Sequence, residues 1–271
     1  MQSSAEMVSR RLDNARPAML LDESTAGNVA TGLDADLGPL LPGTVHVWAI
    51  NVDKSIDTNL YVASLSAAEL CRVQALRSGR DRQCLIARRG ALRQLLGRYL
   101  AHEPADIEID EGGGRKPALA APRCEHGADK IRFNCSHSDG MALLAFTQDM
   151  AVGIDLERVR PMPEADDVAL RFFSQHEYRA LMDVPQRDRL AAFYECWTQK
   201  EAVIKALGQG FAMPLDSFTV SNVRGRRTQL TRLDGGNPGD WMLASLPLLS
   251  GYSSALAIRA RLPVKIVTSW T

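Results

Sequence analysis

The chain has 271 residues, of which 45% are hydrophobic and 24% are charged, with 32 Lys and Arg residues against 32 Asp and Glu residues. These proportions are ordinary for a globular protein and exclude wholesale disorder or a fibrous architecture. The zero net charge argues against bulk attraction to nucleic acid or to an anionic membrane, so we expect neither as a partner.

Cysteine usage and targeting signals predict the compartment. The five cysteines form no Cys-x-x-Cys pair, and an odd number suits no closed set of disulfides, so we expect reduced thiols. The fragments Cys124-Glu-His126 and Cys135-Ser-His137 have a spacing unlike that of structural zinc sites. The N-terminus lacks a basic-then-apolar signal, and no apolar run approaches the roughly 20 residues of a membrane span. The sequence predicts a soluble, cytoplasmic protein.

The N-terminal elements follow from periodicity and capping. Residues 1–40 show no sustained pattern, and we expect an extended or partly disordered lead-in. Residues 44–52 alternate like a strand. The capping box of Ser66 and Glu69 predicts a helix to about residue 78, and a second helix is expected over 80–100.

The C-terminal elements alternate in type, which indicates an α+β fold. We expect strands at 141–146 and 151–157 joined by a turn, helices at 164–173, 174–182 and 188–207, and strand-like runs with turns over 215–260. A capping box of Ser174 and Glu177 opens the second helix, and the third stops at Gly208 and Gly210. A lead-in at 1–40 and two α+β halves, 41–150 and 151–271, are the predicted domains.

Three acidic residues occupy unexpected positions on two elements. On the strand at 151–157, Asp155 and Glu157 share the face opposite the apolar side chains. On the helix at 188–207, Glu201 projects from an apolar stripe, and Lys205 follows four residues later. A carboxylate in a buried stripe is costly unless a cation or hydrogen bonds compensate it.

Two interpretations of these acids remain open from the residues alone. Lys205 could compensate Glu201 in a structural ion pair. Alternatively, Asp155, Glu157 and Glu201 could share a divalent metal, for which ligation by oxygen alone favours Mg²⁺ or Mn²⁺.

Basic residues supply candidate phosphate ligands. Eight arginines fall between residues 72 and 98 against the single acid Asp81, and arginine forks suit phosphate oxygens. An acidic protein partner or a solvated helix face would account for them equally well. Lys116, after three glycines and before Pro117, could add a charge from a loop. No Walker loop and no Gly-x-Gly-x-x-Gly motif is present.

Residues 133–138 (Phe-Asn-Cys-Ser-His-Ser) precede a predicted strand. Ser136 and His137 could hydrogen-bond a phosphate. A Ser-His hydrolase is the competing interpretation, but adjacent residues on an extended segment point apart, and the chain has no Gly-x-Ser-x-Gly elbow.

Five segments together resemble one known family. Val-Gly-Ile-Asp-Leu-Glu at 152–157 and Trp-Thr-Gln-Lys-Glu-Ala-Val-Ile-Lys at 197–205 resemble the paired signatures of the 4′-phosphopantetheinyl transferases. Residues 114–117, 134–138 and 171–174 are similar to the supporting motifs of its larger, monomeric class. That class activates carrier proteins of polyketide, nonribosomal peptide and fatty-acid synthases. The resemblance covers about residues 45–260.

The resemblance implies an activity and an architecture. The activity is transfer of the phosphopantetheine arm of coenzyme A to a serine of an apo acyl or peptidyl carrier protein, with release of 3′,5′-ADP. The implied fold is two similar α+β halves related by a pseudo-twofold axis, with the active site in the cleft between them.

The resemblance also implies a role for each matching residue. Asp155, Glu157 and Glu201 match the family's metal-binding acids, and Glu201 also matches the base for the incoming serine. Lys205 matches a lysine that lies near the pyrophosphate and protonates the leaving phosphate. The expected coenzyme A contacts are Arg72, Lys116, Pro117, Ser136 and His137, with the histidine towards the 3′-phosphate. Cys84 stands where many members carry a basic residue, so the N-terminal ligand set departs from the family pattern.

Two rival functions use the same residues. A Mg²⁺-dependent phosphohydrolase or nucleotidyltransferase would act on a nucleotide without a carrier protein. A catalytically silent relative would only dock carrier proteins, and it would not need the intact set of Asp155, Glu157, Glu201 and Lys205.

Overall fold

A computed structural model describes residues 19–21, 33, 37–53, 58–111, 116–120, 130–208, 213–221 and 228–270. Most of the expected lead-in, the glycines at 112–114, Cys124, His126 and Gly210 lie outside the described residues. No helix in the described part of the chain is both long enough and apolar enough to cross a membrane.

The first layer of strands is a five-stranded sheet. Its order is β1 (Met19–Leu21), β12 (Val264–Trp270), β2 (Thr44–Asn51), β6 (Met141–Gln148) and β5 (Ile131–Ser138). β5, β6 and β2 pair antiparallel, whereas β12 runs parallel to both β2 and β1. The predicted strands at 44–52 and 141–146 are confirmed. The segment 133–138, expected ahead of a strand, is itself in a strand, because Ile131 and Phe133 are buried in the core beneath it.

Helices cover the outer face of this sheet. They are α2 (Thr58–Ala63), α3 (Ala67–Ala75) and α4 (Gly79–Leu100). The capping box of Ser66 and Glu69 is present at the start of α3, as predicted. The sequence did not predict α2, because six residues are too short to show a helical period. α2 packs on α4 at Gly90, where an added Cβ would lie 2.3 Å from Cβ of Tyr61.

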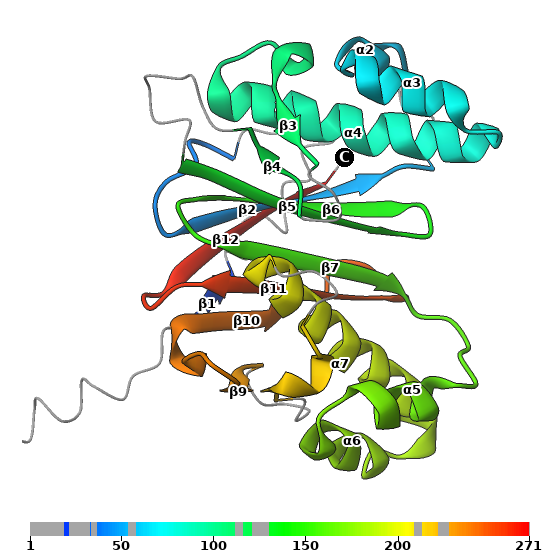
Figure 1. The fold of residues 1–271 in the computed structure, drawn as a ribbon, viewed down its shortest axis with the longest axis vertical. Helices are drawn as coiled ribbons and strands as arrows, with labels where there is room; N and C mark the ends of the chain where they lie inside the picture. The colour runs from blue at the N-terminus through cyan, green and yellow to red at the C-terminus, as the bar shows by residue number, and fades with distance from the viewer. Residues whose placement is uncertain are drawn as a thin grey trace, which may run out of the picture.

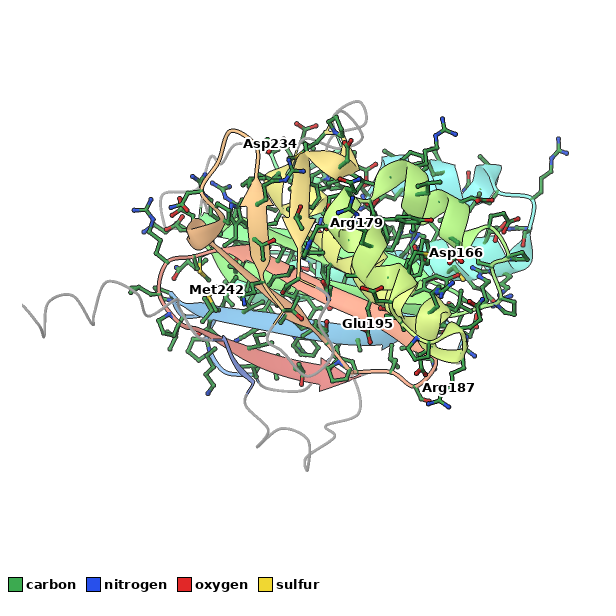
Figure 2. The ribbon with its side chains drawn as sticks, turned by 90° about the horizontal axis from the view of Figure 1, so that it is seen from below. Asp166, Arg179, Arg187, Glu195, Asp234 and Met242 are labelled. Atoms are coloured by element: carbon green, nitrogen blue, oxygen red, sulfur yellow. The ribbon has the colours of Figure 1, made fainter. Side chains whose placement is uncertain are left out.

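The second sheet has three antiparallel strands in the order β10 (Trp241–Ser245), β11 (Tyr252–Arg259) and β7 (Val152–Arg158). Its outer layer holds α5 (Ala165–Phe172), α6 (Gln175–Met182) and α7 (Gln186–Leu207). The expected helices and the capping box at Ser174 are confirmed. α7 ends at Gly208, whose φ of 71° suits glycine. Figure 2 views this part from below, with the exposed Arg179 and Arg187 on α6 and α7.

The two sheets face each other, which gives four layers in the order helix, sheet, sheet, helix (Figure 1). The core between the sheets is aliphatic, with Val45 and Leu143 from the first sheet and Ile154 and Leu256 from the second. β6 is therefore buried on both faces, which explains its unbroken apolar run. The turn after β6 leads into the other sheet, so β6 and β7 do not form a hairpin.

The last strand of the chain does not follow the expected division into two halves. β12 belongs to the predicted C-terminal half but lies in the first sheet, between β1 and β2. The boundary near residue 150 stays a prediction. Two small ladders complete the described strands: β3 (Ile109–Asp110) with β4 (Ala118–Leu119), and β8 (Phe218–Val220) with β9 (Leu230–Leu233).

Candidate functional site

Side chains of β5 join the edges of the two sheets. Asn134 Oδ1 accepts a hydrogen bond from the backbone N–H of Ile154 at 2.8 Å. Ser136 Oγ donates to Asp155 Oδ1 at 2.9 Å, and Ser138 Oγ donates to Glu157 Oε2 at 3.0 Å. Alternate residues of a strand point to the same side, so one edge of β5 fixes two of the acids predicted for the site.

Gly153 brings α7 against β7. A Cβ added at Gly153 would lie 2.0 Å from the carbonyl oxygen of Ala202 and 2.4 Å from the backbone nitrogen of Ala206. The two backbones are therefore in direct contact, which only glycine permits. The acids of the strand and the polar residues of the helix meet because of this contact.

Lys205 pairs with the strand and not with its neighbour on the helix. Its Nζ lies 2.6 Å from Asp155 Oδ1, 2.9 Å from Ser136 Oγ and 3.2 Å from the carbonyl oxygen of Ile154. Among the described contacts Lys205 therefore pairs with Asp155 and forms no ion pair with Glu201, although its charge partly offsets the rise in the pKa of Glu201. The close approach at Gly153 brings the ammonium group to Asp155 and to a backbone acceptor.

The three carboxylates crowd one another. Burial, followed by the charge of Asp155, raises the pKa of Glu157 and of Glu201 above the usual range. Asp155 is only 3% exposed, and its Oδ2 is buried without a hydrogen-bond partner. An orphaned carboxylate oxygen beside two repelled carboxylates has the chemistry of a cation ligand.

The three acids have the residue types of a divalent metal site. The donor set is all oxygen, and the unpartnered Oδ2 of Asp155 can accept a cation, so the residue types fit Mg²⁺. As placed, no three His, Cys, Asp or Glu side chains among the described residues converge closely enough to hold an ion. Metal ligation by Asp155, Glu157 and Glu201 therefore stays a prediction.

These acids line a cavity of about 610 Å³, within the roughly 300–1,000 Å³ of typical ligand pockets. β7 and α7 contribute the polar side and Trp197, while α4 contributes Leu85 and Leu92 with Arg88 and Arg89. Of the nine predicted site residues, the cavity is lined by Arg72, Pro117, Ser136, His137, Asp155, Glu157, Glu201 and Lys205.

Lys116 is the predicted site residue outside the lining. Its Nζ donates to the backbone carbonyl of Val152, at the start of β7. Burial lowers the pKa of Lys116 from 10.5 to about 8. The next residue, Pro117, does line the cavity; the proposed coenzyme A contact of Lys116 stays a prediction.

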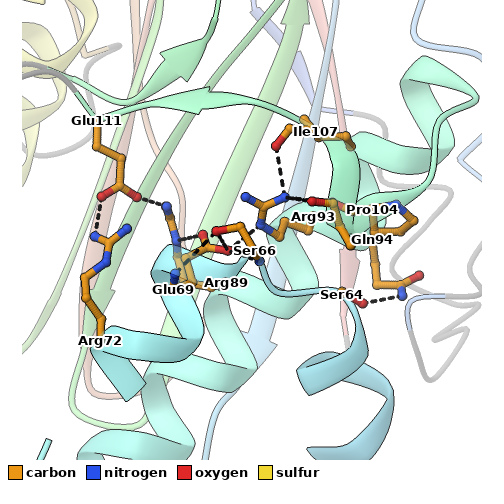
Figure 3. Close-up of polar contacts among 11 residues, drawn as sticks. Ser64, Ser66, Glu69, Arg72, Arg89, Arg93, Gln94, Pro104, Ile107 and Glu111 are labelled. Atoms are coloured by element: carbon orange, nitrogen blue, oxygen red, sulfur yellow. Dashed lines mark hydrogen bonds and ion pairs between the residues drawn. The ribbon is translucent and has the colours of Figure 1, made fainter. Parts of the chain in front are cut away.

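Much of the arginine cluster is structural (Figure 3). Arg93 is 3% exposed; it bonds Glu69 Oε2 at 2.5 Å and the carbonyl oxygens of Pro104 and Ile107 at 2.8 and 3.0 Å. Arg89 bonds Glu69 Oε1 at 2.7 Å. The interpretation as a solvated helix face is wrong for these two arginines, because both bond to Glu69. Glu69 lies on α3, and the periodicity of one helix gives no information about contacts with another helix.

Sequence reasoning also missed two positioning residues. The spacing of two between Ser136 and Ser138 places both side chains on the same side of β5. Gly153 lies on the face of β7 that carries Asp155 and Glu157. An isolated glycine within a strand pattern is itself a signal of close backbone approach.

Comparisons with known proteins agree with these features. The 4′-phosphopantetheinyl transferase superfamily model matches residues 151–257. The 4′-phosphopantetheinyl transferase HetI of Nostoc is 38% identical over 175 residues, which are 64% of this chain and 72% of HetI. A 4′-phosphopantetheinyl transferase of Bacillus subtilis is 32% identical over 64% of this chain and 79% of its own length. The structure of Thermotoga maritima holo-[acyl-carrier-protein] synthase is 22% identical over 41% of this chain and 63% of its own, with a TM-score of 0.33.

The α+β fold thus carries a cavity lined by three carboxylates and a lysine, which are the residue types of an enzyme site. Because the chain is 38% identical to HetI over 72% of the length of HetI, it belongs to the 4′-phosphopantetheinyl transferases. The resemblance expected from the sequence is thereby confirmed, and so is the enzyme class.

Proposed function

We propose that this chain transfers the 4′-phosphopantetheine arm of coenzyme A to a serine hydroxyl of an apo acyl or peptidyl carrier protein, with release of 3′,5′-ADP. The observation that carries the proposal is that Lys205, Asp155, Glu157 and Glu201 line the same cavity. Its volume of about 610 Å³ is in the range of pockets that hold small-molecule ligands and cofactors.

The acids would hold Mg²⁺ or Mn²⁺, with Asp155 Oδ2 as an available ligand atom. When bound, the metal supplies neutralisation of charge on the pyrophosphate. Lys205 adds a fixed cation from the α7 side, oriented by its bonds to Ser136 and Ile154.

Two residues of α7 carry out the proton transfers. Glu201 takes the proton of the carrier serine as its oxygen attacks the phosphorus that bears pantetheine. The bond from that phosphorus to the ADP oxygen breaks, and Lys205 gives a proton to the departing phosphate. Solvent then removes the proton from Glu201 and returns one to Lys205.

The other predicted contacts serve binding. Arg72, Pro117, Ser136 and His137 line the cavity, and we assign them, with Lys116, to coenzyme A. The helix, sheet, sheet, helix order supports two similar halves about a pseudo-twofold axis with the substrate in the cleft between them. We infer that the protein acts as a cytoplasmic monomer on carrier proteins of polyketide, nonribosomal peptide or fatty-acid synthases.

The test is intact-protein mass spectrometry of an apo acyl or peptidyl carrier protein incubated with this chain, coenzyme A and Mg²⁺. We expect a mass gain of one phosphopantetheine, which EDTA abolishes and Mn²⁺ restores. Consumption of coenzyme A with water alone would instead indicate a phosphohydrolase. Coenzyme A binding without transfer to any of several carriers would indicate a silent relative.

A further inference from the structure

Arg88 on α4 is a half-buried cation for which the described residues supply no hydrogen-bond or ion-pair partner. It lines the cavity, its Nε is buried with no hydrogen-bond acceptor, and among the described residues it makes no ion pair. The pKa of Arg88 is lowered, because partial burial removes water from around its charge. A desolvated donor without an acceptor is costly, and in native proteins it commonly marks an unseen ion or ligand.

The other cations of the cavity wall are already neutralised. Arg72 pairs with Glu111, and Arg89 pairs with both Glu111 and Glu69, as Figure 3 shows. Lys205 pairs with Asp155 on the opposite side. Within the described lining, Arg88 is therefore the arginine without an ion-pair partner in the free protein.

The surroundings of Arg88 suit an anion. It lies within electrostatic reach of Cys135 on β5, and His137 follows two residues later on the same side of that strand. Their cross-strand partners on β6, Leu144 and Ala142, also line the cavity. The carboxylates Asp155 and Glu157 accept hydrogen bonds from Ser136 and Ser138. These serines alternate with Cys135 and His137 along β5, so their side chains point to the opposite side of the strand.

We propose that the Arg88 guanidinium binds a phosphate group of coenzyme A at the wall formed by α4 and β5. The inference rests on the proposed function, which supplies coenzyme A as the ligand. A guanidinium presents a planar fork that matches two phosphate oxygens. Coenzyme A carries phosphate both in its pyrophosphate and at the 3′ position, and the experiment separates the two.

The test compares Arg88→Gln with the wild type by titration calorimetry of the free protein with coenzyme A. The matched control is Arg82→Gln, which removes an equal charge from an exposed position of the same helix outside the cavity. We expect Arg88→Gln to raise Kd about 10- to 100-fold, the effect of losing a hydrogen bond to a charged group. Arg82→Gln should change Kd less than about twofold, as expected for a screened surface charge.

Dephospho-coenzyme A, which lacks the 3′-phosphate, identifies the bound group. If Arg88 binds the 3′-phosphate, the penalty of Arg88→Gln disappears with this analogue. If it binds the pyrophosphate, the penalty persists. Arg88→Lys, which keeps the charge but loses the fork, should give an intermediate Kd for coenzyme A.

Thermal unfolding distinguishes ligand binding from a structural role. Because Arg88 is unpaired in the free protein, Arg88→Gln should leave its Tm unchanged or raise it, while the upward shift caused by coenzyme A shrinks. A lower Tm of free Arg88→Gln, or a Kd of this variant equal to that of the wild type, would overturn the assignment of Arg88. Neither result would contradict the proposed transfer activity of the wild type. Failure of the wild type itself to bind coenzyme A would refute the proposed function, and this inference with it.

Discussion

Lys205 Nζ lies 2.6 Å from Asp155 Oδ1, and Ser136 Oγ bonds to both groups, at 2.9 Å from each. The ammonium group thus holds one oxygen of the carboxylate and leaves the other, Oδ2, buried without a partner. This arrangement gives Asp155 a fixed orientation and one available ligand atom before any substrate binds.

Glu201→Gln should abolish phosphopantetheine transfer while the fold remains intact. The amide cannot accept the serine proton and is a weaker metal ligand. Transfer is measured by mass spectrometry of the carrier protein, and folding by circular dichroism and Tm. Glu195→Gln, on the same helix and outside the cavity lining, is the control; near-normal turnover of Glu201→Gln at saturating Mg²⁺ would remove Glu201 from the mechanism.

Ser138→Ala should weaken the response to Mg²⁺ more than it lowers the maximal rate. Ser138 Oγ donates to Glu157 Oε2 and accepts the backbone N–H of Arg158 at 3.1 Å. Loss of one such bond, worth about 1 kcal/mol, should raise the half-saturating Mg²⁺ concentration roughly fivefold. Ser138→Thr retains the hydroxyl and should behave like the wild type; equal Mg²⁺ curves for all three proteins would exclude this positioning role.

Lys116→Ala should mainly raise the KM for coenzyme A. The pKa of Lys116 is lowered to about 8, so the folded protein loses this charge as the pH rises through 8, whereas the unfolded chain keeps it to about 10.5. We therefore expect the wild-type KM to rise between pH 7 and 9 and the KM of the variant to stay flat over this interval. Identical KM values for variant and wild type at pH 7 would exclude Lys116 from the binding site.

Lys200→Met should destabilise the protein by about 3–5 kcal/mol, because it leaves a buried carboxylate without its counter-charge. Lys200 and Glu177 are fully buried, with Nζ 2.7 Å from both carboxylate oxygens, and Glu177 also accepts the backbone N–H groups of Ser174 and Val220. Glu177→Gln combined with Lys200→Met should recover part of the loss, measured by urea unfolding. Strict additivity of the two single variants would contradict this coupling.

Stability should fall in mild acid because of His46 on β2. Burial, and secondarily the charge of Lys265, lower its pKa from 6.5 to about 4. Between these values the unfolded chain binds more protons than the folded one, so the free energy of unfolding decreases as the pH falls from 6.5 towards 4. The contribution is about 3 kcal/mol over that interval.

Urea unfolding of the wild type and of His46→Gln at several values between pH 7 and 4 measures this contribution. The variant loses the bond between Nδ1 of His46 and the Tyr99 hydroxyl, so its stability at pH 7 should be lower, but its dependence on pH should be shallower. Parallel curves for the two proteins would show that another group carries the acid sensitivity.

The sequence by itself determined the local structure and the chemistry of the acids. The capping boxes at Ser66 and Ser174 fixed the start of two helices, since they involve residues three apart. The alternation on β7 placed Asp155 on the face opposite the apolar side chains, and the helical period of α7 placed Glu201 in an apolar stripe. All of these signals lie within a few residues of one another.

Only the tertiary structure decided which charges pair. Lys205 bonds to Asp155, fifty residues away, because Gly153 lets two backbones touch. Arg89 and Arg93 find Glu69 across two helices, whereas Arg88 finds no acceptor. Pairing depends on distances between elements that packing sets, and a one-dimensional pattern carries no such distances.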